Sequence, residues 1–583
     1  MRKFLLAGSL LALSAPAFAD ANNDLTALVN DVWATNLKEQ PVYASALGVN
    51  DYATQLGDYT LVAQDRRAAD AQAFLARLNA IPATTLSPTS KVEAGILRRA
   101  LQSAIEGNIF GQRAINFTTY SSWHQQLAGM AQNLPFKTKA DFESYNARLV
   151  QYARVNDENI DVANVAIKGK YTQPCETLNG FEGTISGLIA PDIRKSRFYD
   201  PYVAKRPDNV SEADFTALAS AAENIINNVI HPALNKQLSW YIKDYKPACS
   251  KAPGVSAQPG GAAYYAFRIR EETTTDLTAE QIHKIGLSEV SRIRAEMTDV
   301  AKNAGYPTRE AFIAHLRTDP QYYAKTPEEL MEKVARVPKI IDGKMPSLFG
   351  RLPRLPYGIK EIPAETAEGT TTAYYNQGSP EIGISGTYFV NTSKLNQRPY
   401  WEIPALSVHE AVPGHHHQIA LQQELPLSDF RKYGAFFTAF TEGWGLYSER
   451  LGIEMGLYDT PAKDMGRLSY EMWRACRLVV DTGIHAKGWT KQQAIAFMTE
   501  NSALSAANIE AEVNRYISWP GQALAYKLGE LKIRELRAMA TKELGPKFDL
   551  AAFHDAILGQ GSVPLNVLEQ QIKDWVAAEK AKG

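Results

Sequence analysis

The chain has 583 residues, a formal net charge of −1 and 45% hydrophobic residues. This length allows a large core in more than one lobe, and the ordinary composition excludes a chain that is disordered throughout. The near-neutral charge gives no sign of the basic surface on which nucleic-acid binding depends, so we expect no nucleic-acid partner.

The first 19 residues have the pattern of a signal peptide. Arg2 and Lys3 precede a short apolar run, and Ala17 and Ala19 supply a small-x-small cleavage site. We therefore predict an exported protein, with the periplasm as the favoured compartment and secretion as the alternative; a retained anchor helix is the competing interpretation. No later stretch is apolar for the ~20 residues that a membrane-spanning helix needs, so we expect no membrane contact after cleavage.

Residues 20–250 are expected to form a helical N-terminal lobe. Apolar residues recur there at helical spacing in four segments, which are 24–37, 62–79, 140–167 and 212–235. A stretch rich in Pro, Gly and Ser, residues 246–261, marks the boundary to a second region, 262–583. All clustered catalytic residue types lie in that second region.

The cysteine content is compatible with one disulfide. An oxidising compartment permits a bond between Cys175 and Cys249. Cys476 lies in an apolar stretch and would then remain as a buried thiol. Three cysteines so far apart in the sequence do not form a cysteine-type metal site.

The second region combines helices with one short β element. A helix is predicted after Thr278, which has capping-box spacing to Gln281, and Gly305 follows its end. Further on, TTAYYNQGSPEIGISGTYFVNT, residues 371–392, has β-branched and aromatic residues interrupted by a Gly-Ser-Pro turn. This pattern predicts a strand, a turn and a second strand just before a cluster of histidines.

The segment HEAVPGHHHQ, residues 409–418, has the residue types of a zinc site at an unusual spacing. Helical zinc motifs place two histidines four residues apart with a glutamate beside the first, but here Pro413 occupies the fourth position after His409. On a regular helix, positions six apart differ by about 240°, so His409 and His415 would not converge. Pro413 interrupts the helix and Gly414 frees the backbone, which would bring His415 round to the metal.

The identity of the second histidine ligand stays open between two neighbours. We favour His415. His416 shares a helix face with His409 but lies about 10.5 Å away in rise, which makes it the second choice. His417 is expected to face solvent or to support a ligand. A Pro-Gly turn that is followed by three histidines and binds no metal is the remaining interpretation.

A third ligand is available in the next predicted helix. A catalytic zinc ion takes three protein ligands and leaves one position for water. Residues 436–456 are expected to be helical and carry Glu442, which would complete a set of two histidines and one glutamate. Zn²⁺ is therefore the cofactor that this set of residues favours.

HEAVPGHHHQ and EGWGLYSERLG (residues 442–452) together resemble the bacterial domain-of-unknown-function family 885, DUF885. Further blocks of the resemblance cover roughly 262–560, and the family looks distantly related to the gluzincin zinc metallopeptidases. The resemblance implies a mostly α, large helical gluzincin-like fold with a small antiparallel β element next to the active-site helix. It also implies His409, His415 and Glu442 as zinc ligands, Glu410 as general base and a peptide substrate.

Peptide hydrolysis would need groups besides the metal and its base. The oxyanion of a tetrahedral intermediate needs a donor, and the candidates are His485, Tyr516 and Tyr526. Arg515 and Lys527 are candidates for holding a substrate carboxylate.

Three further residues have expected roles around this centre. Tyr388 lies in the predicted strand pair, whose edge would bind an extended peptide. Glu449 or Asp481 would orient a ligand histidine. Two other functions compete with a peptidase: hydrolysis of another amide or ester at the same centre, and a non-catalytic scaffold that binds peptides.

Overall fold

The computed structural model describes residues 17–119, 121–368 and 370–582. The predicted signal peptide lies outside the described residues except for 17–19, which begin the first helix. Within the described ranges, no helix combines the length and the apolar character that crossing a membrane requires. The chain is mostly helical, with one small sheet, as the sequence predicts.

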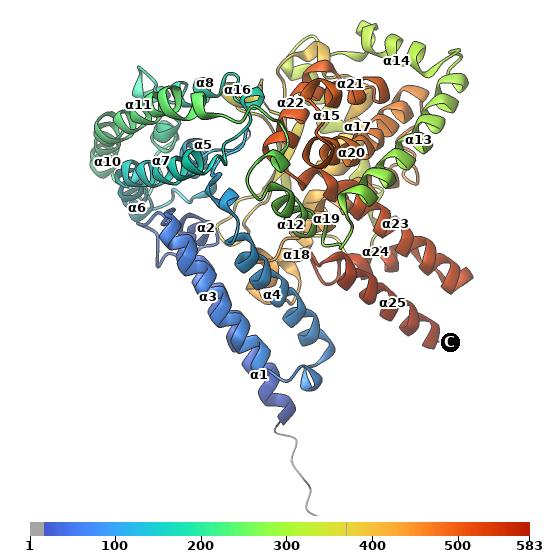
Figure 1. Ribbon diagram of the computed structural model, residues 1–583, viewed down its shortest axis with the longest axis horizontal. Coiled ribbons are helices and arrows are strands. Elements are labelled where there is room, and N and C mark those ends of the chain that lie inside the picture. Colours follow the sequence, from blue (N-terminus) through green and yellow to red (C-terminus); the bar gives the residue numbers. More distant parts are fainter. Residues whose placement is uncertain (1–16, 120, 369, 583) are drawn as a thin grey trace, which may run out of the picture.

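The first four helices are α1 (Ala17–Glu39), α2 (Pro41–Ala46), α3 (Leu61–Ala80) and α4 (Pro88–Gly107). All of them except α2 contribute to a large core that is shared with the C-terminal half. Leu28 and Leu97 of this group belong to the same buried core as Trp444 and Val479. In Figure 1, α1, α3 and α4 are the long blue helices that extend from the body of the molecule.

A second, smaller core lies mainly within residues 117–245. It surrounds aromatic residues such as Phe142 and Tyr241. The helices of this part are α5 (Trp123–Ala128), α6 (Lys139–Val150), α7 (Tyr152–Gly169), α8 (Phe181–Ser186), α9 (Asp200–Val203), α10 (Glu212–Ile225) and α11 (His231–Trp240). The first 245 residues are thus shared between two cores, a division that apolar periodicity alone does not reveal.

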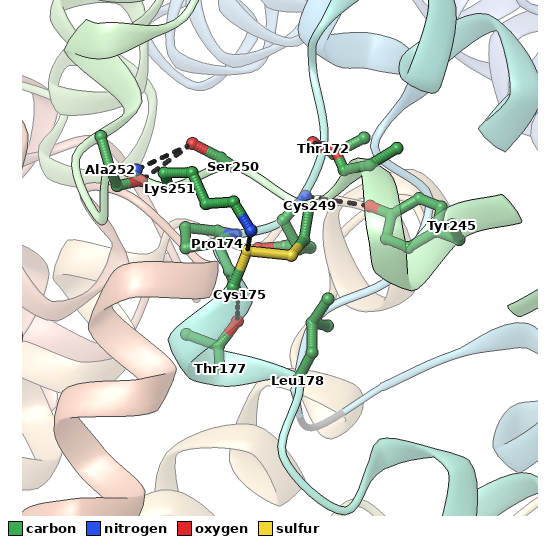
Figure 2. Close-up of a disulfide and its surroundings, with 12 residues drawn as sticks. Thr172, Pro174, Cys175, Thr177, Leu178, Tyr245, Cys249, Ser250, Lys251 and Ala252 are labelled. Carbon is green, nitrogen blue, oxygen red and sulfur yellow. Dashed lines mark hydrogen bonds between the residues drawn. A yellow bond between two sulfur atoms is a disulfide. The ribbon is translucent and has the colours of Figure 1, made fainter. Parts of the chain in front are cut away.

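A disulfide joins Cys175 and Cys249, as the sequence permitted, with their Cα atoms 5.0 Å apart. Figure 2 shows the bond beside Ser250, whose backbone pairs with the segment before Cys175. Cys175 N donates to Ser250 O at 2.9 Å, and Ser250 N donates to Gln173 O at 3.0 Å. The bond therefore closes the loop that contains α8–α11 and joins its start to the segment that leads into the second region. Cys476 is buried and unpaired, as expected.

The C-terminal half is built around one buried helix. Its helices are α12 (Gly261–Thr273), α13 (Ala279–Asn303), α14 (Arg309–Thr318), α15 (Pro327–Asp342), α16 (Ala364–Ala367), α17 (Ile403–Glu410), α18 (His415–Glu424), α19 (Thr438–Leu451), α20 (Pro461–Lys487), α21 (Lys491–Asn501), α22 (Ala506–Ser518), α23 (Ala525–Leu544), α24 (Leu550–Leu558) and α25 (Leu565–Ala581). Helix α13 begins with the predicted capping box of Thr278 and Gln281. Every residue of α20 from Met465 to His485 is buried. Gly286 of α13 allows the close approach to α20, since a Cβ atom there would lie 2.7 Å from Leu478 Cβ.

The sheet has three strands: β1 (Tyr357–Glu361), β2 (Ala373–Asn376) and β3 (Gly386–Val390). Their order is β1-β3-β2; β3 pairs antiparallel with β2 and parallel with β1. The predicted antiparallel pair is therefore present as β2 and β3. The sequence did not predict β1, which is short, half-buried and preceded by prolines, and which makes the sheet mixed. Strands β2 and β3 contact α17 and α18, so the sheet lies against the histidine segment.

Candidate metal centre

The two helices that carry the histidines are separated by a tight bend. Helix α17 ends at Glu410, and α18 begins at His415. The peptide bond between Val412 and Pro413 is cis. Gly414 folds back over the end of α17, and its N–H donates to Val408 O at 2.9 Å. A Cβ atom at Gly414 would lie 1.9 Å from His409 O, so only glycine fits this approach.

The bend brings His415 to His409, and α19 adds Glu442. The two imidazole rings have centroids 4.6 Å apart and are nearly perpendicular, at 83°. Glu442 Oε2 lies 3.5 Å from His409 Nε2 and 3.4 Å from His415 Nε2. Ligand atoms of the three residues all fall within 4.8 Å of one another. The structure therefore brings together the three predicted ligands.

These distances suit a shared ion better than direct hydrogen bonds. An N–H···O bond has its heavy atoms about 2.9–3.0 Å apart. Two ligands about 2.0–2.1 Å from a tetrahedral zinc ion are separated by about 3.3 Å. Among the described residues, none donates a hydrogen bond of acceptable geometry to the buried Glu442 Oε2. Two imidazoles and one carboxylate are also the donor types that zinc accepts, so the residues fit this metal.

Glu449 orients His409 from the side opposite Glu442. Its Oε1 atom lies 2.8 Å from His409 Nδ1 and 2.8 Å from a guanidinium nitrogen of Arg474. This ion-pair contact favours a proton on Nδ1 and directs Nε2 toward Glu442 and His415, where a metal would bind. Burial disfavours the charged imidazolium, but the carboxylates of Glu442 and Glu449 raise the pKa of His409 to about 9, so a metal that binds at Nε2 would displace a proton. Gly445 makes room, because a Cβ atom there would lie 2.7 Å from His409 Cε1.

The charge of Glu442 is also stabilised within the cluster. Burial by itself would raise the pKa of this carboxyl group. The interactions with His415 and His409 outweigh burial and hold the pKa of Glu442 well below its usual range. The carboxylate is therefore available in its anionic form at neutral pH.

The side chains of His416 and His417 contact other parts of the protein and lie outside the set of metal ligands. His416 Nε2 donates to Leu355 O at 2.9 Å, and its Nδ1 lies 3.0 Å from the hydroxyl of Tyr375 on β2. Both ring nitrogens of His416 are thus occupied, which excludes the second choice of ligand in this conformation. His417 is fully buried against Phe349, at 4.5 Å between ring centroids, so the expectation that it faces solvent was wrong.

Glu410 and Tyr388 lie together in the interior. Glu410 follows His409 and is 8% exposed. Tyr388 on β3 is fully buried; burial raises the pKa of its phenol, and the negative charge of Glu410 acts in the same direction. Strand β3 is paired on both sides, so Tyr388 offers no backbone edge to a substrate. The prediction that it binds substrate needs correction, because the free edges belong to β1 and β2.

Tyr526 and Arg515 belong to the surroundings of the metal centre. The ring of Tyr526 is nearly parallel to that of His409, with an interplanar angle of 17° and centroids 6.3 Å apart. Its hydroxyl lies 3.4 Å from both a guanidinium nitrogen of Arg515 and Nε2 of Gln522. The guanidinium of Arg477 lies 4.0 Å from the ring centroid of Tyr526. Tyr526 therefore connects the ligand His409 with a group of arginines.

Three other residues that the sequence predicted for the site, His485, Tyr516 and Lys527, form hydrogen bonds or ion pairs away from the metal centre. His485 Nε2 donates to Tyr516 O at 2.9 Å, and its Nδ1 accepts from Val255 N at 3.1 Å, so no ring nitrogen remains for an oxyanion. The hydroxyl of Tyr516 accepts hydrogen bonds from Trp473 and Arg477 in a buried network.

Lys527 is fully buried and forms ion pairs of 2.9–3.0 Å with Glu289, Glu471 and Glu530. It does not reach a substrate carboxylate. The other expected orienting residue, Asp481, instead accepts hydrogen bonds from the Tyr265 hydroxyl and from Gly521 N. Both corrections have the same cause, since buried ionisable groups take partners that lie far away in the sequence.

Sequence reasoning missed the arginines of α20. Arg474 supports Glu449, and Arg477 pairs with Glu512 at 2.9 Å. A signal for them exists, because charged residues recur every three to four positions along this otherwise apolar helix: Arg467, Glu471, Arg474, Arg477 and Asp481. A charged stripe on a buried helix indicates partners on the neighbouring helices.

Comparison with known proteins agrees with this architecture. A crystal structure of a candidate lipoprotein from Colwellia psychrerythraea superposes with a TM-score of 0.86 and 29% identity, covering 96% of this chain and 99% of that one. A second candidate lipoprotein, of unknown function and from Shewanella oneidensis, has the same fold, with a TM-score of 0.67, 21% identity, and coverage of 96% and 100%. No curated protein matches the chain. The family model described as "Bacterial protein of unknown function (DUF885)" matches residues 41–572, and the protein therefore belongs to this family.

Proposed function

We propose that this protein is an exported, zinc-dependent peptidase. The observation that carries the proposal is the convergence of His409 Nε2, His415 Nε2 and Glu442 Oε2. Glu410 stands next to the first ligand in sequence, and Glu449 orients that ligand. The chemistry that zinc supplies, when bound, is Lewis acidity toward water and toward a carbonyl oxygen. A distant relationship to the gluzincin metallopeptidases is part of this proposal.

Glu410 is the proposed general base. It would take a proton from the attacking water and return it to the leaving amine. Its burial, at 8% exposure, keeps bulk water away from the transferred proton. Tyr526 is the proposed donor to the oxyanion, because its ring lies along His409 and its hydroxyl is within 3.4 Å of Arg515.

Strand β2 is the proposed docking edge for the substrate backbone. It is an edge strand of the sheet, and it contacts the ligand helix α17. An extended peptide that pairs with such an edge gains main-chain hydrogen bonds without regard to its sequence. This arrangement favours a peptide over a small ester.

Export is proposed from the N-terminal sequence and from the relatives. Arg2, Lys3 and the apolar run before Ala19 have the pattern of a signal peptide. Two similar solved structures are described as candidate lipoproteins. A disulfide between Cys175 and Cys249 suits an oxidising compartment such as the periplasm.

The test compares the mature protein with its Glu410→Gln variant. Zinc content is measured by elemental analysis, and cleavage of a complex peptide mixture is followed by mass spectrometry. We expect one zinc per chain in both proteins and at least a hundredfold slower cleavage by the variant. Zinc without peptide cleavage would favour hydrolysis of another amide or ester, and absence of zinc would refute the proposed centre.

A further inference from the structure

A large cavity lies next to the sheet, on the side of the N-terminal helices. Its volume is about 840 Å³, and it is lined by α1–α5 together with residues 376–379, which are the last residue of β2 and the three that follow it. Binding sites for small molecules commonly measure about 300–1,000 Å³. The helices that enclose it form the blue and teal part of Figure 1. The three metal ligands do not line this cavity, so it is a separate compartment.

Strand β2 connects the cavity to the metal centre. Its last residue, Asn376, and the following Gln377 line the cavity. The preceding residue, Tyr375, reaches His416 through its hydroxyl at 3.0 Å, and His416 directly follows the ligand His415. Strand β2 also contacts α17, which carries the ligand His409, so a peptide that pairs with the edge of β2 would lie between the metal centre and the cavity.

The walls of the cavity combine apolar surface with charged groups, which are the acids Glu39, Asp58 and Asp70 and the base Arg67. Phe74 and Trp123 contribute apolar surface. Asp70 of α3 also lines it, and among the described residues no basic group lies within ion-pair distance of its carboxylate. Glu39, another lining acid, is already matched by Arg66 and Arg67 at 2.7 and 3.1 Å.

We propose that this cavity binds the amino-terminal segment of an oligopeptide, with its free α-ammonium group at Asp70. The proposal rests on the proposed peptidase function, which it deepens by naming the substrate class. A half-buried carboxylate without a basic partner favours a cation and disfavours a carboxylate. Since β2 runs from the sheet toward the cavity, a peptide with its amino end there lies antiparallel to β2.

This orientation restricts the substrates. The size of the cavity limits the number of residues that it can hold on the amino side of the scissile bond. Peptides with a blocked amino terminus lose the contact with Asp70, and folded proteins do not enter. The expected substrates are therefore short peptides with a free amino terminus.

The test measures binding without catalysis. The mature protein is treated with a chelator, and isothermal titration calorimetry follows the binding of a hexapeptide of alternating alanine and leucine, with a free or an acetylated amino terminus. We expect the free peptide to bind about tenfold more tightly, the order expected for one ammonium–carboxylate contact. Asp70→Asn should abolish this preference, and Asp24→Asn, which removes an exposed acid of α1 outside the cavity, should keep it.

A second variant tests the location. Ala104 is an exposed residue of α4 that lines the cavity, so Ala104→Trp should fill it and weaken the binding of both peptides. Equal binding of free and acetylated peptides by the wild type, or an unchanged preference in Asp70→Asn, would overturn the proposal. Because the readout needs no turnover, a protein that binds as expected but cleaves nothing would refute only the peptidase function. Cleavage without any amino-terminal preference would refute only this inference.

Discussion

The carboxylate of Glu449 should set the zinc affinity of the centre through His409. The Nδ1–Oε1 distance is 2.8 Å, and both side chains are at most 3% exposed. Glu449→Gln keeps the shape of the side chain and removes its charge. The imidazole then loses the partner that fixes its orientation and increases its basicity toward a metal.

The expected loss follows from this geometry. Replacing a group that supports a metal ligand typically weakens metal binding by about 10–100-fold, which corresponds to about 1.4–2.7 kcal/mol. The same substitution leaves Arg474 without its anionic partner in the interior. Breaking a buried ion pair costs about 3–5 kcal/mol, so the variant should also unfold at a lower temperature.

Two measurements separate these effects. Competition with a chelating dye gives the zinc dissociation constant, and circular dichroism gives the melting temperature of the metal-free protein. Glu454→Gln is the matched control, because Glu454 follows the same helix and pairs with Arg537 at 2.7 Å near the surface. A folded Glu449→Gln protein whose dissociation constant stays within twofold of the wild type would refute the orienting role.

Three further outcomes are expected. His415→Ala should lose zinc at stoichiometric concentration, whereas His416→Ala should retain it, as measured by elemental analysis of dialysed protein. The reverse result would identify His416 as the ligand in place of His415. Burial raises the pKa of Glu402 to about 8, so the folded state keeps a proton that the unfolded state releases near pH 4.5. The free energy of unfolding should therefore fall between about pH 4.5 and 8. Urea titrations of Glu402→Gln should not show this decline, and parallel pH dependences of wild type and variant would contradict the prediction. The disulfide closes a loop with a sequence separation of 74. Replacing Cys175 and Cys249 by Ser should therefore lower the free energy of unfolding by roughly 4 kcal/mol, as measured by denaturant titration. An unchanged midpoint of that titration would contradict the prediction.

Local patterns anticipated much of the helical structure. Thr278 and Gln281 cap α13 because their side chains exchange hydrogen bonds with backbone groups three residues apart, which spacing alone reveals. The segment 140–167 was harder to predict. It is two helices, α6 and α7, that meet at Gln151, and neither Gly nor Pro marks the break. The strand β1 also escaped prediction, since its pairing partner β3 lies beyond β2 in the sequence.

The sequence by itself determined the donor types of the centre and the means of bringing them together. His409, Glu442 and the bend at Pro413 and Gly414 follow from residue types and spacing, because proline and glycine act on their own backbone. The choice of His415 over its neighbour was only a preference at that level.

Tertiary structure decided which polar groups remain available. His416 is excluded as a ligand because Tyr375 and Leu355 occupy its ring, and His485 and Lys527 are likewise held by distant partners. The physical reason is that a buried donor, acceptor or charge must be satisfied, and the partner that satisfies it comes from whichever segment packs against it. No spacing rule within one segment contains that information.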